Sequence, residues 1–175
     1  SELWRSPPFA VEDLPINYPF QPTVADLDGD KALEVVTQWA VLNGSDGSVK
    51  YVLSPYTSGL YPADWFPVTA DLDADGAWEI IQENSVFAAN GTSLWDGPDL
   101  DDTMAIDTAY ADFDGDGDAE VVMVQRTSVV QYSASGTPIL TYPDLPGNGM
   151  QLTTADFDGD GAPEVAAATH FEVVM

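Results

Sequence analysis

The chain has 175 residues, of which 45% are hydrophobic and 11% aromatic, so it can bury one core or one closed array of small units. Its formal net charge of −26 argues against nucleic acid or an anionic membrane as a partner. The absence of cysteine excludes disulfides and thiolate metal sites. We expect no membrane insertion, because no apolar run is long enough, and a mature segment or excised domain, because no signal peptide opens the chain.

A nine-residue acidic loop occurs four times along the chain. The copies begin at Asp26, Asp71, Asp112 and Asp156, with spacings of 45, 41 and 44 residues. The last two read Asp-Phe-Asp-Gly-Asp-Gly-x-x-Glu, and the first two are close variants. A repeat period near forty residues is typical of repeat architectures such as the β-propeller.

Residues that favour β-strands surround each loop. A run ending in Ala-Asp precedes every copy, and β-branched residues follow the closing glutamate. A third run comes a few residues later, and in the first three repeats a Gly-containing turn leads to a fourth run. Each repeat therefore predicts a four-stranded antiparallel sheet of the size of a propeller blade.

We predict a single all-β domain, residues 1–175, built as a β-propeller of four-stranded antiparallel blades. The predicted blades are residues 20–54, 65–97, 106–143 and 150–175, and the last of these lacks its outer strand. Residues 1–6 resemble an outer strand without a blade, so we expect them to complete the C-terminal blade and close the ring. A four-bladed monomer is favoured, and the alternative is an eight-bladed dimer in which two copies exchange these strands.

The loops have the composition of a site for a hard divalent cation, which takes about six to eight oxygen ligands. Aspartates at positions one, three and five, a backbone carbonyl at position seven and one or both oxygens of a glutamate at position nine would supply them. Calcium fits better than magnesium, which prefers a rigid octahedron, or zinc, which prefers His or Cys. The predicted ligands are Asp26, Asp28, Asp30, Ala32 and Glu34; Asp71, Asp73, Asp75, Ala77 and Glu79; Asp112, Asp114, Asp116, Asp118 and Glu120; and Asp156, Asp158, Asp160, Ala162 and Glu164. A solvated acidic turn is the alternative for any one loop, but four copies in one register favour up to four calcium ions.

The third and fourth loops resemble the FG-GAP and VCBS repeats of integrin α-chain propellers, fungal lectins and many bacterial surface proteins. The resemblance extends over essentially the whole chain and implies calcium loops on one face and partner binding on the other. Familiar members usually have seven blades, so four is a departure. The second loop has Ala74 and Trp78 at variable positions, which leaves its ligands intact. The first has Lys31 where glycine is usual, and we expect that calcium site to fail first.

The chain offers little material for catalysis. His170 is its only histidine, cysteine is absent, and no Gly-rich phosphate loop occurs. Nearly all carboxylate pairs, which glycoside hydrolysis would need, belong to the acidic loops. We therefore predict that the protein is not an enzyme.

Turns between the second and third strands should open on the face opposite the acidic loops, and they differ among repeats. Candidate ligand-binding residues there and in the crossings between blades are Trp39, Asn84, Arg126, His170, Tyr61 and Trp65. The alternative for the three aromatic residues of this set is packing between blades, and for His170 an ordinary place in a turn.

These features predict a non-catalytic, calcium-binding propeller module, extracellular or on the cell surface, that serves adhesion or binds a protein or glycan ligand. One alternative is a carbohydrate-binding, lectin-like domain or an accessory domain of a polysaccharide-active enzyme. Another is a purely structural repeat module. Neither nucleic acid nor membrane insertion is expected.

Overall fold

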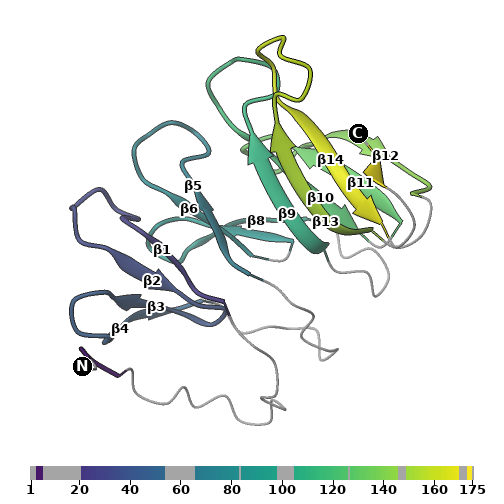
Figure 1. The fold of residues 1–175 in the computed structure, drawn as a ribbon. Coiled ribbons are helices and arrows are strands. Elements are labelled where there is room, and N and C mark those ends of the chain that lie inside the picture. The colour runs from purple at the N-terminus through teal and green to yellow at the C-terminus, as the bar shows by residue number, and fades with distance from the viewer. Residues whose placement is uncertain are drawn as a thin grey trace.

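The structure is a computed structural model that describes residues 3–5, 21–53, 66–82, 84–97, 105–125, 127–145, 149–169 and 173–174 (Figure 1). The regular elements of these residues are β-strands arranged in four antiparallel sheets. Within the described ranges, no helix has the length and hydropathy that crossing a membrane requires.

Three of the sheets have four strands each in simple sequence order. The first sheet contains β1 (Thr23–Ala25), β2 (Glu34–Val36), β3 (Ala40–Asn43) and β4 (Val49–Val52). The second contains β5 (Val68–Ala70), β6 (Glu79–Gln82), β7 (Ser85–Phe87) and β8 (Ser93–Asp96). The third contains β9 (Ala105–Ala111), β10 (Glu120–Gln125), β11 (Ser128–Tyr132) and β12 (Pro138–Tyr142). The predicted all-β class with four-stranded antiparallel units is confirmed.

The fourth sheet contains three strands, β13 (Gly149–Ala155), β14 (Glu164–Thr169) and β15 (Val173–Val174). The sheets stand side by side because the first strand of each lies against the first strand of the next: β1 with β5, β5 with β9, and β9 with β13. Figure 1 shows the result as an open arc with the first and fourth sheets at opposite ends. The predicted closure of the ring is not found in the described residues.

The hydrophobic core lies between neighbouring sheets rather than within one of them. One cluster joins the first and second sheets, with Leu27, Val36 and Val41 packed near Ile80 and Phe87. A second cluster joins the second and third sheets; its members are Ala70, Leu72, Ile81, Val86, Val121, Met123, Val130 and Tyr132. The first three sheets therefore bury their apolar faces against one another, as expected of repeat architectures.

Aromatic side chains cover the tight turns of the following sheet. Trp95 of β8 lies over Gly136 in the turn between β11 and β12 and donates from Nε1 to the Ala134 carbonyl oxygen over 2.8 Å. Tyr51 of β4 lies over Gly91 in the same way and donates its hydroxyl to the Ala89 carbonyl. These glycines have positive φ (82° and 80°), which strains any residue with a side chain, and a ring lies close above them. Replacing either glycine is therefore unfavourable for both reasons.

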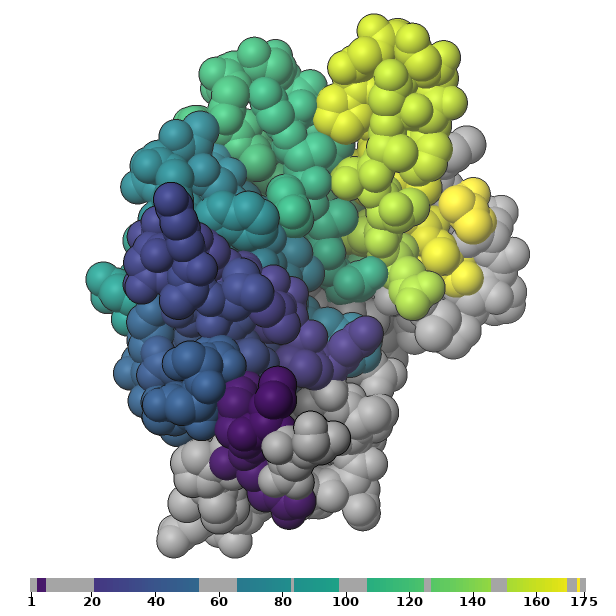
Figure 2. Space-filling model, turned by 60° about the vertical axis from the view of Figure 1, so that its left-hand side comes forward, coloured from purple at the N-terminus to yellow at the C-terminus, as the bar shows by residue number. Residues whose placement is uncertain are grey.

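Trp4 makes the equivalent contact with the first sheet. Its ring lies over Gly47 and its Nε1 donates to the Gly44 carbonyl oxygen over 2.9 Å. In Figure 2, residues 3–5, in dark purple, lie against the blue surface of the first sheet. The pairing predicted between residues 1–6 and the C-terminal blade is thus not observed: residues 3–5 form no strand, and the described partner of β15 is β14. The Trp4 indole instead packs on the turn glycine Gly47 of the first sheet.

Candidate metal centres

Each acidic loop connects the first and second strands of its sheet, between β1 and β2, β5 and β6, β9 and β10, and β13 and β14. All four loops project from the upper edge of the array in Figure 1. The antiparallel pairing fixes their ends, since the alanine before each loop faces its closing glutamate: Ala25 with Glu34, Ala70 with Glu79, Ala111 with Glu120 and Ala155 with Glu164. The ends of the four loops are therefore fixed by the same strand pairing.

The aspartate at position one organises the loop backbone. One of its carboxylate oxygens accepts a hydrogen bond from the backbone N–H at position six in every copy. The distances are 2.9 Å from Lys31 to Asp26, 3.1 Å from Gly76 to Asp71, 3.1 Å from Gly117 to Asp112 and 3.0 Å from Gly161 to Asp156. Lys31 has a φ of 72°, so it adopts the left-handed conformation of the glycines in the other loops. This lysine does not break the loop, although the conformation costs a non-glycine residue about 1–2 kcal/mol.

The aspartate at position five caps the loop locally. Its side chain accepts from the backbone N–H at position seven, with distances of 2.7 Å for Asp30 and Ala32, 2.8 Å for Asp75 and Ala77, 2.9 Å for Asp116 and Asp118, and 2.9 Å for Asp160 and Ala162. Ligation by the carbonyl oxygens at position seven stays a prediction.

The glutamate at position nine ties the loop to the start of its turn. Its Oε2 accepts from the backbone N–H at position two, over 3.0 Å from Leu27 to Glu34, 2.9 Å from Leu72 to Glu79, 2.8 Å from Phe113 to Glu120 and 2.8 Å from Phe157 to Glu164. One oxygen of each glutamate is thereby committed to the backbone. This geometry favours one metal-binding oxygen from each glutamate over the bidentate arrangement that the sequence left open.

The remaining carboxylate oxygens converge. In the first three loops, one oxygen from each of positions one, three and nine lies within 4.8 Å of the others; the groups are Asp26, Asp28 and Glu34, then Asp71, Asp73 and Glu79, then Asp112, Asp114 and Glu120. In the fourth loop the aspartate at position five joins the group, which contains Asp156, Asp158, Asp160 and Glu164. A set of carboxylate oxygens on a rigid frame fits a hard cation such as calcium.

The charge on these groups makes them receptive to a cation. Burial raises the pKa of Glu79, which is 6% exposed; the Leu72 N–H bond lowers it, and the charges of Asp73 and Asp75 raise it further. Ionising this glutamate beside two other carboxylates therefore costs free energy. A bound divalent ion would remove the repulsion and stabilise the ionised form.

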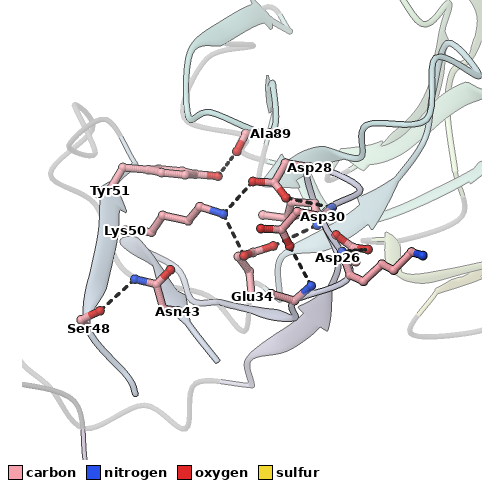
Figure 3. A network of polar contacts seen from close by, with 12 residues as sticks. Asp26, Asp28, Asp30, Glu34, Asn43, Ser48, Lys50, Tyr51 and Ala89 are labelled. Carbon is pink, nitrogen blue, oxygen red and sulfur yellow. Dashed lines mark hydrogen bonds and ion pairs between the residues drawn. The ribbon is translucent and has the colours of Figure 1, made fainter. Parts of the chain in front are cut away.

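The first loop differs because a lysine reaches into it (Figure 3). The Lys50 ammonium donates to Asp28 Oδ2 over 2.9 Å and to Glu34 Oε1 over 2.8 Å. The hydrogen bond from Lys50 is the largest cause that lowers the pKa of Asp28. Burial disfavours the protonated lysine, but its bonds to Glu34 and Asp28 outweigh burial and raise the pKa of Lys50. Sequence reasoning missed this residue, although it stands where the second and third repeats have Leu94 and Ile139, three positions after the turn glycine.

The predicted ligand-binding residues are only partly described. Tyr61, Trp65, Arg126 and His170 lie outside the described residues. Trp39 and Asn84 lie in the turns that join the second and third strands of their sheets, and both are half-buried. The Asn84 side chain donates to the Gly97 carbonyl oxygen over 3.0 Å, so part of its amide already holds the sheet together. Ligand binding by these six residues stays a prediction.

Comparison with known proteins supports the repeat assignment. A family model for the FG-GAP-like repeat matches residues 112–167, which include the third and fourth acidic loops. No curated protein sequence matches the chain.

Among solved structures, the biofilm matrix protein Bap1 of V. cholerae matches with a TM-score of 0.61 and 17% identity over 77% of this chain and 22% of its own. The rhamnogalacturonan lyase YesW matches with a TM-score of 0.63 and 20% identity over 86% of this chain and 35% of its own. The rhamnogalacturonan lyase PL11 of Bacillus licheniformis matches with a TM-score of 0.60 and 20% identity over 85% of this chain and 28% of its own.

At such identities the likeness concerns the fold, and the chain spans between about a fifth and a third of the length of these three proteins. The four sheets match propeller-containing structures, which agrees with the predicted blades. Residues 112–167 therefore contain an FG-GAP-like repeat, within a chain of four blade-like antiparallel sheets.

Proposed function

We propose that the protein is a non-catalytic, calcium-binding propeller module that serves adhesion or ligand binding outside the cell or at the cell surface. The observation that carries the calcium assignment is the common frame of the four loops. In each one, backbone N–H groups fix the carboxylates at positions one and nine, and other carboxylate oxygens converge within 4.8 Å. Calcium is the cation that this oxygen-only set suits best.

Calcium in these loops would hold the sheets together. Without a cation, several like charges on each short turn repel one another and oppose folding. A site at 100-fold excess of calcium over its Kd adds about 2.7 kcal/mol to the free energy of unfolding. Several sites of this strength would decide whether a domain of ordinary stability, about 5–15 kcal/mol, folds.

The test is thermal unfolding with and without calcium. We expect chelation to lower Tm by more than about 10 °C, since each kcal/mol shifts Tm by about 2–4 °C in a domain of this size. Asp114→Asn should reduce the calcium-dependent gain. Asp144→Asn is the matched control, because it removes the same charge from an exposed residue outside the loops whose φ of 59° asparagine tolerates. An unchanged melting curve in excess chelator, from protein that carries no metal, contradicts the calcium assignment.

The proposed place outside the cell draws support from the similarity to a biofilm matrix protein and from the strong acidity of the chain. We expect the ligand to be a protein or a glycan that binds the face opposite the acidic loops. Replacing Trp39 and Asn84 together by alanine should weaken binding of such a ligand. If binding to every identified partner survives this change, the purely structural alternative gains support.

A second candidate function is carbohydrate binding as an accessory domain of a polysaccharide-active enzyme. It is favoured by one observation, that two of the similar structures are rhamnogalacturonan lyases. A glycan array that includes rhamnogalacturonan distinguishes the two candidates. Saturable, calcium-dependent glycan binding supports the second, whereas protein binding without any glycan signal supports the first.

Ring closure is part of the same proposal. Trp4 covers Gly47 as Tyr51 covers Gly91, which supports residues 3–5 as the outer strand of a blade that precedes the first sheet. In a four-bladed monomer that blade is the fourth sheet, and in a strand-exchanged dimer it belongs to a second copy. The mass in solution decides between one chain and two, and we favour one.

A further inference from the structure

We propose that Lys50 is a built-in counter-ion of the first acidic loop that takes the place of calcium, so that the chain has three calcium sites rather than four. This inference rests on the calcium function proposed above. It assigns the difference between the first loop and the others to a residue on β4, outside the loop itself.

The contacts of Lys50 carry the argument. Its ammonium binds Asp28 and Glu34, two of the three residues whose oxygens converge in this loop. Glu34 is 2% exposed, and its other oxygen accepts the Leu27 N–H, so both of its oxygens have a donor. The loop thus presents calcium with a ligand set whose charge is already partly neutralised.

The neighbouring repeats show that the fold does not require a lysine at this position. Lys50 follows Gly47 by three residues, and the residues in the same place after Gly91 and Gly136 are Leu94 and Ile139. Both are more than half exposed, at 51% and 54%, and neither can supply a positive charge. The second and third loops therefore receive no cation from this strand position.

Calcium and the ammonium would compete for the same oxygens. Because two positive charges within a few ångströms repel each other, calcium can use Asp28 and Glu34 only if Lys50 leaves. The Lys50 side chain is 27% exposed, so its departure also exposes a packed aliphatic stem. Calcium affinity in the first loop should accordingly be much lower than in the others.

The first loop nevertheless keeps the shape of a cation site. Asp26 Oδ1 is buried and has no hydrogen-bond partner in the described structure, although its Oδ2 accepts the Lys31 N–H like its counterparts. A buried carboxylate oxygen without a donor is costly unless a cation lies near. We therefore expect calcium to bind this loop once Lys50 is replaced.

The experiment counts calcium ions bound to the full chain by native mass spectrometry and by titration calorimetry, with calcium as the only added ligand. The wild type should bind three ions, and Lys50→Leu, which copies the second repeat, should bind four. The reciprocal Leu94→Lys places the lysine beside the second loop on an exposed side chain, so it should fold and should weaken one site by at least tenfold. Lys31→Gly is the control for the other lysine and should still bind three.

The outcomes separate this inference from the calcium function itself. Four tight sites in the wild type, or no gain in Lys50→Leu together with no loss in Leu94→Lys, would overturn the role of Lys50 and leave calcium binding intact. A fourth bound ion in Lys31→Gly would show that Lys31, rather than Lys50, weakens calcium binding in the first loop, and would also overturn the role of Lys50. An absence of calcium from the wild type and all three variants would instead refute the proposed function.

Discussion

The interface between the second and third sheets and the interface between the third and fourth join sheets of the same strand order but differ in their packing. In the former, Trp95 covers Gly136, and Tyr132, fully buried, lies with its ring centroid 5.5 Å from that of Trp95. In the latter, the place of Trp95, four residues after the turn glycine, belongs to Leu140, which is 59% exposed. Beside Leu140 is a hollow of about 280 Å³.

The hollow is lined from both sheets. Val122, Val129 and Tyr142 contribute from the third sheet, and Val165 and Ala167 from the fourth. The pairing of the first two strands is alike in the two sheets, because the register of β13 with β14 reproduces that of β9 with β10 around the acidic loop. This difference indicates that the repeated sequence motifs determine the strands of each sheet. The stability of each interface between sheets depends instead on a few aromatic residues at fixed distances in sequence from the turn glycine.

The largest effect should come from removing the aromatic centre of the tight interface. Tyr132→Ala deletes a fully buried ring from the second cluster and should lower the free energy of unfolding by about 3–5 kcal/mol, as large-to-alanine changes in cores do. Chemical denaturation at saturating calcium measures it, because calcium then contributes equally to both proteins.

The matched control for this change is Tyr142→Ala, which removes the same side chain from the rim of the hollow, where it is 54% exposed. It should cost less than about 1 kcal/mol, because little of its ring is buried. Equal losses for the two tyrosines would mean that the two interfaces do not differ in strength.

Much of this arrangement follows from the sequence, because the acidic loops recur in one register and mark where two strands of every sheet begin and end. The Ala-Asp that opens each loop and the glutamate that closes it predicted where the two strands end and begin, and the structure pairs those ends, such as Ala25 with Glu34 and Ala155 with Glu164. Alternation of loop, strand and glycine turn then gave the four-stranded sheets. These are local features, and local spacing is enough to predict them.

The contacts between sheets could not be read in the same way. Trp4 lies over Gly47 as Trp95 lies over Gly136, but the rule that this aromatic covers a turn glycine is a matter of packing, so the position of Trp4 was not predicted. The approach of Lys50 to Asp28 depends on the shift in pairing of β3 with β4 between Val41 and Leu42, which recurs in the second and third sheets but is not visible in the spacing of the sequence motifs. The hydrogen bond from the Leu27 N–H to Glu34, which occupies one oxygen of that glutamate, likewise depends on the loop conformation.

A smaller effect should follow from crowding the covered turn. Gly136→Ala places a methyl group 2.5 Å from the Trp95 ring at a φ of 82°, and Gly115→Ala introduces the same methyl at a φ of 76° with no atom within 4 Å. Both variants should lose about 1–2 kcal/mol of unfolding free energy, because alanine is strained in the left-handed conformation. Gly136→Ala should lose about 1–3 kcal/mol more, because its methyl group overpacks against the ring. Denaturant titration measures the unfolding free energy of the two variants, and the difference between their losses is the contribution of the contact with the Trp95 ring. If the two losses agree, the indole does not hold the turn.

Gly115→Ala is a fair reference because the second loop already has alanine at that position, where Ala74 adopts a φ of 55°. The variant should therefore keep its calcium site, and calorimetry should give the wild-type number of ions. Loss of an ion in Gly115→Ala would mean that its destabilisation reports on calcium rather than on the backbone.

The smallest effect should come from the hydrogen bond that fixes the covering ring. Trp95→Phe keeps an aromatic face toward Gly136 but removes the Nε1 donor, which lies 2.8 Å from the Ala134 carbonyl oxygen in a half-buried site. The loss should be about 0.5–1.5 kcal/mol for the bond, with a further contribution from the smaller ring. Trp78→Phe makes the same exchange in the second acidic loop, at a side chain that is 39% exposed. The difference between the two losses of unfolding free energy gives the contribution of the Nε1 hydrogen bond and of the ring that covers Gly136. Because Leu140 offers no such donor at the interface with the fourth sheet, a Trp95→Phe protein that unfolds at the wild-type denaturant midpoint would show that the indole bond does not distinguish the two interfaces.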